Sequence, residues 1–157
     1  MRRRRPGLGW FLVVVAVCAI AACVVIGMMQ KVHGAELQRG ELDMMVRIVQ
    51  AETTGEPVEG QRAVAFVMLN RLAAGTFGGT LTKVLLKPYQ FTRPAPLDDI
   101  SPSYLKAMLA TVQAVLRVVP DDSRGATHFH LCSMKPWPDW ARRLKPTVRI
   151  SSHCFYR

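Results

Sequence analysis

The stretch that decides the helical part of the fold is residues 41–75, which read ELDMMVRIVQAETTGEPVEGQRAVAFVMLNRLAAG. Apolar residues recur at helical spacing over Leu42–Val49 and predict a first helix that ends near Gly55. Pro57 suits the first position of a second helix, where its missing N–H costs nothing. Apolar residues continue along that second helix as far as Gly75. The stretch therefore predicts two helices joined by a turn, with the second buried on most sides.

The rest of the chain predicts two more helices and then strands. Leu81–Leu86 is expected to form a short helix, and Lys87–Pro102 an ordered but irregular loop that contains several prolines. Ser101 and Pro102 are a helix-start signal, and apolar residues follow at helical spacing until Pro120. Short strands are expected over Ala126–Cys132 and Thr147–Tyr156. Helices followed by a small C-terminal antiparallel sheet predict the α+β class.

The N-terminal segment predicts a membrane anchor. Pro6–Gln30 carries no charge and is long enough, at about 1.5 Å per helical residue, to cross a hydrocarbon layer of about 30 Å. The basic residues Arg2–Arg5 precede it, which predicts a cytoplasmic N-terminus and export of everything after Lys31. The predicted organisation is an arginine cluster and transmembrane helix at 1–31, a linker at 32–40 and a catalytic domain at 41–157. We expect a single-pass protein of the inner membrane whose domain faces the periplasm or the cell wall.

Two other fates of this segment stay open. The sequence from Ile20 to Cys23 resembles a bacterial lipobox, which would make Cys23 a lipidated N-terminus. A cleaved signal peptide would need small residues at its cleavage site, and His33 stands at such a position.

Net charge limits the partners. The chain has 21 Lys and Arg residues against 11 Asp and Glu. Without Arg2–Arg5 and Lys31, 16 basic residues face 11 acidic ones, which suits work near an anionic polymer. It is not the dense basic stripe that binding to many phosphates requires, so we expect no nucleic-acid partner.

The cysteines divide between the two parts of the chain. Cys18 and Cys23 lie within the apolar segment, and Cys132 and Cys154 lie in the exported part. In an oxidising compartment the latter pair is a disulfide candidate, and two unpaired buried thiols are the alternative.

Glu52 is the strongest candidate for acid catalysis. It ends an apolar helix directly before a turn, where partial loss of water would raise the pKa of its carboxyl group and let it donate a proton. Glu56 and Glu59 are instead expected to complement the dipole at the start of the second helix.

Several blocks of the sequence resemble one enzyme family. The run Ala51–Ala65, followed by Asn70 and Arg71, resembles the core of the spore-cortex-lytic (SleB-type) cell wall hydrolases. The later matching blocks, in the same order and at compatible spacing, are Gln90-Phe91, Gly125–His130, Trp140-Ala141 and the C-terminal Ile150, His153 and Phe155–Arg157. The resemblance covers Leu42–Arg157.

This resemblance implies a lysozyme-like catalytic domain that acts on peptidoglycan between N-acetylmuramic acid and N-acetylglucosamine. We also expect a monomer and no cofactor. Glu52 falls on the catalytic glutamate of the family. A lytic transglycosylase mechanism, with one acid and 1,6-anhydro products, is expected. Ordinary hydrolysis would use a second carboxylate. The candidates for it, none in an apolar frame, are Glu56, Asp98, Asp99, Asp121 and Asp122.

The resemblance also implies a set of substrate-binding residues, which are Asn70, Gln90, Phe91, Thr127, His128, Trp140, His153 and Tyr156. Asn70 could instead cap its helix, and Trp140 and Tyr156 could instead belong to the core. We expect no metal, although the residue types of His128, His130, Cys132 and His153 would suit zinc. Where the family usually has glycine, two residues before the terminal histidine, this chain has Ser151.

Two rival functions remain. A wall-binding protein without activity would keep the groove, but it would have no reason to bury an acid at Glu52. An amidase that acts on the peptide stem would normally require zinc.

Overall fold

The helix–turn–helix predicted from residues 41–75 is present in the computed structural model, which describes residues 39–93 and 101–157. Helix α2 spans Arg39–Glu52 and α3 spans Val58–Ala74. Gly55 makes the turn with a φ of 82°, a value that residues with a Cβ rarely adopt. Pro57 is the residue before α3 rather than its first residue, and a left-handed glycine, Gly75, ends the helix as predicted.

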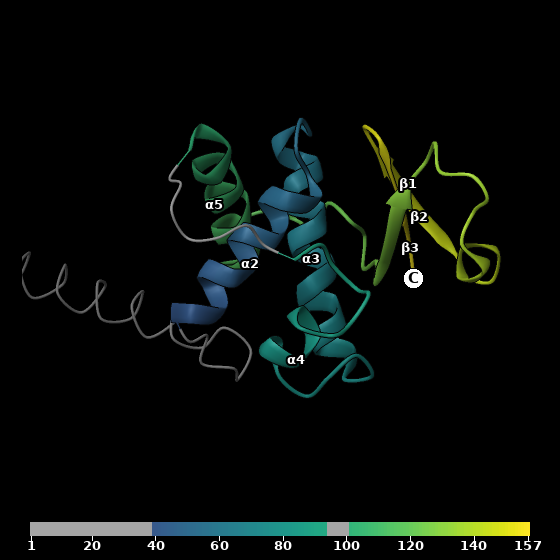
Figure 1. Cartoon of the computed structure of the whole chain (residues 1–157), viewed down its shortest axis with the longest axis horizontal. Helices are drawn as coiled ribbons and strands as arrows, with labels where there is room; N and C mark the ends of the chain where they lie inside the picture. Colours follow the sequence, from purple (N-terminus) through teal and green to yellow (C-terminus); the bar gives the residue numbers. More distant parts are fainter. Residues whose placement is uncertain (1–38, 94–100) are drawn as a thin grey trace, which may run out of the picture. The chain divides into compact units, whose positions relative to one another are not determined.

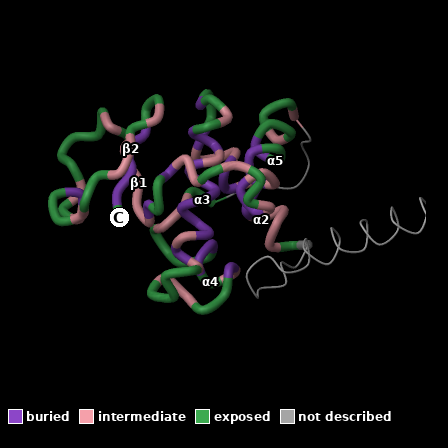
Figure 2. Tube along the Cα trace, turned by 180° about the vertical axis from the view of Figure 1, so that it is seen from behind, coloured by how far each residue is buried: buried purple, intermediate pink, exposed green. Residues whose placement is uncertain are grey.

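Helix α3 is the centre of the core, because it contacts α2, α4 and α5. Its residues from Ala63 to Met68 are all buried, and Figure 2 shows buried stretches of the tube at α3. The short helix α4 spans Leu81–Leu85, as expected, and is capped by the Thr80 side chain. The prediction of a second helix buried on most sides is therefore confirmed.

Helix α5 spans Pro102–Val115 and differs from its prediction in two ways. The Ser101 side chain caps it as expected, but it ends at Val115 and not at Pro120. Its buried face is also the one with small side chains, which are Ala107, Ala110, Thr111 and Ala114. The larger Leu105, Met108 and Leu109 point to solvent. Small residues let α5 approach its neighbours closely, and the apolar pattern alone does not reveal which face does so.

The sheet has three antiparallel strands in the order β1-β3-β2. They are β1 His128–Leu131, β2 Pro146–Ile150 and β3 His153–Tyr156, with a short 3₁₀ helix, η1, at Asp139–Arg142. The single strand predicted over Thr147–Tyr156 is thus a hairpin. Ser151 lies in its turn with a φ of 47°, so this position does use the left-handed conformation that favours glycine.

The sheet and the helices α2 and α5 lie on opposite sides of α3 (Figure 1). Phe155 is 1% exposed and Phe129 packs with it, so this side of the sheet joins the helical core. The α+β class is therefore confirmed.

The predicted anchor and most of the predicted linker lie outside the described residues. Within residues 39–93 and 101–157, no helix is long and apolar enough to cross a membrane.

Candidate active site

Glu52 is the last residue of α2, where its side chain is half-buried. Its Oε1 accepts a hydrogen bond from the backbone N–H of Thr92, in the loop after α4. The carboxylate is therefore held where the end of α2 meets that loop. It keeps enough exposure to meet a substrate.

Glu56 is a buried carboxylate, contrary to its expected role as a surface charge at the start of a helix. It is 5% exposed, and its Oε1 accepts a hydrogen bond from the Ser152 hydroxyl group. Its Oε2 has no hydrogen-bond partner and faces Gly60, where an added Cβ would lie 2.9 Å away. Burial alone would raise the pKa of Glu56, but hydrogen bonds from Ser152 and the nearby His153 outweigh it and hold the pKa below its usual range.

His153 lies near both Glu56 and Glu52, and the negative charge of each carboxylate acts on its pKa. It is 4% exposed, and its Nδ1 lies 3.5 Å from Oε1 of Glu56. Its ring packs edge-on against Phe129, with centroids 5.5 Å apart. Burial lowers the pKa of His153 even though Glu56 and Glu52 both act to raise it. The imidazole is therefore neutral near pH 7.

Arg71 is a buried cation that sequence reasoning left out of the site. Its Nε donates to the carbonyl of Thr127 at 2.6 Å, and its guanidinium carbon lies 4.8 Å from the ring centroid of Phe91 and 5.0 Å from that of Phe77. Burial lowers the pKa of Arg71 to about 10, against the pull of Glu52. A charged residue within a helix predicted to be buried on most sides was the signal that could have identified it.

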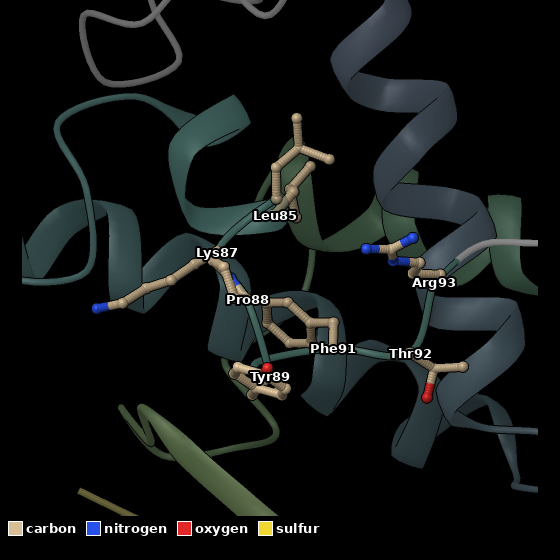
Figure 3. A pocket seen from close by; sticks show the side chains of 8 residues that line it. Leu85, Lys87, Pro88, Tyr89, Phe91, Thr92 and Arg93 are labelled. Atoms are coloured by element: carbon tan, nitrogen blue, oxygen red, sulfur yellow. The ribbon is translucent and has the colours of Figure 1, made fainter.

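Gln90 and Phe91 lie in the loop after α4, just before Thr92, which bonds Glu52. Phe91 lines a pocket of about 750 Å³, and Gln90 does not. Figure 3 shows Phe91 at the centre of the lining side chains. Phe91 stacks on Phe129 of β1, with ring centroids 6.5 Å apart, and so connects the loop to the sheet. Gln90 is half-buried. Their roles toward a substrate stay predictions.

Asn70 has a structural set of contacts. Its Nδ2 donates to Oδ2 of Asp121 at 3.0 Å, to the carbonyl of Ala126 at 3.0 Å and to Oγ of Ser123 at 3.2 Å. It thus fastens α3 to the loop before β1. The helix is capped by Gly75, so Asn70 does not cap it. These contacts use its amide N–H groups, and substrate binding by Asn70 stays a prediction.

Other residues predicted to bind substrate lie on the opposite face of the sheet from His153. His128 and Tyr156 are register partners there, and Trp140 packs on both, at centroid distances of 5.0 and 5.6 Å. Thr127 directly precedes His128 in the chain, and its Oγ1 lies 2.9 Å from Nδ1 of His128. Burial and the neighbouring Arg71 lower the pKa of His128. His128 nevertheless contacts the site through Phe77, because its ring centroid lies 5.4 Å from that of Phe77, on which Arg71 also packs.

The Cys132–Cys154 disulfide is present, with Cα atoms 5.2 Å apart. The sulfur of Cys132 is thus not a thiolate ligand. Of the three histidines considered for zinc, His128 and His130 lie on one face of the sheet, where His130 bonds the Tyr156 hydroxyl group, and His153 lies on the other, where it packs on Phe129. No group of three or more possible metal ligands occurs in the part of the chain that the structure describes.

The two carboxylates have different chemical capacities. Glu56 is buried and held ionised, so it is neither reachable nor a proton donor near neutral pH. Glu52 lies at the surface of the domain, beside the pocket. Of these two carboxylates only Glu52 is accessible for acid–base chemistry, and Glu56 forms a cluster with the buried His153 and the exposed Ser152. Asp98 and Asp99, which were also candidates for a second carboxylate, lie outside the described residues.

Comparison with known structures shows the same fold in two solved domains. The structure resembles the catalytic domain of the SleB protein of Bacillus cereus with a TM-score of 0.68 and 23% identity, over 81% of this chain and 97% of that one. It resembles the corresponding domain from Bacillus anthracis with a TM-score of 0.64 and 24% identity, over 80% of this chain and 98% of that one.

The chain belongs to the cell wall hydrolase family, whose model matches residues 55–156. The matched range begins after Glu52. A spore cortex-lytic enzyme of Bacillus subtilis is 31% identical over 73% of this chain and 37% of its own length, and one of Oceanobacillus iheyensis is 42% identical over 36% of this chain and 21% of its own. The chain thus spans well under half of these longer relatives. The cell wall hydrolase CwlJ of Bacillus subtilis is 28% identical over 74% of this chain and 84% of its length.

Proposed function

We propose that the domain cleaves the glycan strands of peptidoglycan between N-acetylmuramic acid and N-acetylglucosamine, as a lytic transglycosylase with Glu52 as its acid and base. The observation that carries this proposal is the difference in accessibility between Glu52, which is half-buried, and Glu56, which is 5% exposed. Glu56 is buried and occupied by Ser152, so a mechanism with two carboxylates would lack an accessible second one at this position. The solved domain from Bacillus anthracis is itself described as a germination-specific lytic transglycosylase.

In the proposed reaction, Glu52 first donates its proton to the glycosidic oxygen as the bond to C1 of the muramoyl residue breaks. The resulting carboxylate then takes the proton of the muramoyl 6-hydroxyl group, whose oxygen bonds to C1. The products are a 1,6-anhydro end and a free 4-hydroxyl group on the glucosamine, and the proton is back on Glu52. The backbone N–H of Thr92 holds the carboxylate in place during both transfers.

The place of action is part of the proposal. The uncharged Pro6–Gln30 segment and the preceding Arg2–Arg5 support a single inner-membrane anchor with the domain exported. The disulfide supports an oxidising compartment as well. N-terminal sequencing of the mature chain would test this, and a chain that begins at Cys23 or Glu36 would contradict the anchor.

The decisive experiment is mass spectrometry of the fragments released from purified sacculi by the wild type and by Glu52→Gln. We expect 1,6-anhydro ends from the wild type and at least a hundredfold less product from the variant, since general acid catalysis contributes about 10²–10⁴ in rate. Glu59→Gln is the matched control, because Glu59 is an exposed carboxylate in the first turn of α3. Reducing ends would indicate hydrolysis, freed peptides an amidase, and binding without products an inactive wall-binding protein.

A further inference from the structure

The pocket beside Glu52 combines an apolar floor with a cation. Leu85, at the end of α4, is 3% exposed and forms the floor together with Phe91. Thr92 lies in the wall, and its N–H is the group that binds Glu52. Glu52 does not itself line the pocket but bonds to Thr92, which does, so a molecule in this pocket would lie near the carboxylate that is proposed to cleave the glycan.

Arg93 supplies the cation. Figure 3 shows its guanidinium group directed toward the space between Leu85 and Phe91, whereas Lys87 extends away from it. Arg93 is exposed and forms no ion pair with any residue in 39–93 or 101–157. A guanidinium group binds a carboxylate through two parallel hydrogen bonds, so this position favours a ligand with a carboxylate.

Tyr89 is a second and independent feature of the same pocket. Its φ is 60°, and its side chain is fully exposed, at 103% of the reference area. A bulky residue other than glycine in the left-handed region is uncommon and costs free energy, and such residues gather at binding sites. An aromatic ring held in solvent on the rim of a pocket is suited to stacking on a ligand.

We propose that this pocket binds the peptide stem of the muramoyl residue next to the bond that is cleaved. The stem carries small apolar side chains and free carboxylates, which match the Leu85–Phe91 floor and the Arg93 guanidinium respectively. The pocket thereby makes the enzyme select glycan that bears peptides over glycan without them. This inference rests on the proposed glycan cleavage by Glu52.

The test compares kinetics on soluble peptidoglycan oligosaccharides and on the same oligosaccharides after their peptides have been removed enzymatically. We expect the full-length wild type to prefer the peptide-bearing substrate about tenfold in kcat/KM, the size of effect that one charged hydrogen-bonded pair provides. Arg93→Gln should raise KM about tenfold on that substrate alone, with kcat unchanged. Tyr89→Ala should also raise KM, and Lys83→Gln, which removes an exposed cation from α4 outside the pocket lining, should change nothing.

Equal effects of Arg93→Gln on both substrates, or no preference in the wild type, would overturn the proposal. Calorimetric titration with a muramoyl monosaccharide that carries its peptide gives a readout that does not depend on cleavage. There, a Kd about tenfold weaker in Arg93→Gln than in the wild type supports the pocket, and equal affinities reject it. If the wild type cleaves neither oligosaccharide, the proposed function fails while this titration still decides the pocket.

Discussion

Removing the Cys132–Cys154 disulfide should lower the stability of the domain by an amount that follows from the chain it closes. The two cysteines are 22 residues apart in the sequence, and the chain-entropy relation assigns a loop of that size about 3 kcal/mol. For a domain of roughly a hundred residues, 1 kcal/mol corresponds to at least about 4 °C, so the melting temperature should fall by at least about 12 °C. Calorimetric scans of the purified chain with and without reductant measure this difference.

The double variant Cys132→Ser/Cys154→Ser is the matched control. It should melt at the temperature of the reduced wild type, and reductant should not shift it further. Glycan cleavage at low temperature should survive in both, because neither sulfur touches Glu52 in the structure. An unchanged melting temperature after complete reduction of the wild type, verified by thiol titration, would refute the assignment of a stabilising role to this bond.

Three further predictions concern the buried cluster and the hairpin turn. Gly60→Ala should destabilise the fold by about 1–3 kcal/mol in urea unfolding, because its Cβ would press on the buried carboxylate of Glu56, whereas Gly79→Ala, with open space around it, should be nearly neutral. Ser151→Gly should stabilise by roughly 1 kcal/mol, because its φ of 47° is costly for a residue with a Cβ; equal or lower stability would contradict that. Stability should fall as pH drops below about 6.5, because the lowered pKa values of His153 and His128 mean that the unfolded chain takes up these protons first. A second loss should follow below about 4.5, where Glu56 is protonated in the unfolded chain before the folded one. His153→Gln should flatten the first part of that curve, and an identical slope would show that other groups cause it.

The helices could be predicted because their limits are local. Gly55, Pro57 and Gly75 each mark a turn or a helix end through their own backbone preferences, and Ser101 does so through a side chain that reaches only three residues ahead. The face of α5 could not be predicted in this way. Which side of a helix is buried depends on the shape of its neighbours, and here small residues fit where larger apolar ones do not.

Site residues likewise divide into those whose role depends on local sequence, which could be predicted, and those whose role depends on distant partners, which could not. Glu52 can be identified from its place at the end of an apolar helix, but Glu56 takes its character from Ser152, which lies 96 residues further along the chain. Predicted strand alternation correctly puts His128 and His130 on one face. It does not say which face meets the helices, so the sequence could not assign the expected substrate residues to one face or the other.

The order β1-β3-β2 leaves β2 with an open edge, and an open edge is where a second chain can add a strand and begin to aggregate. The sequence of β2 opposes this. Pro146, its first residue, has no N–H to offer, and the exposed Arg149 would bring like charges together if two copies paired. This edge of the sheet is thereby protected from pairing with the same edge of a second copy.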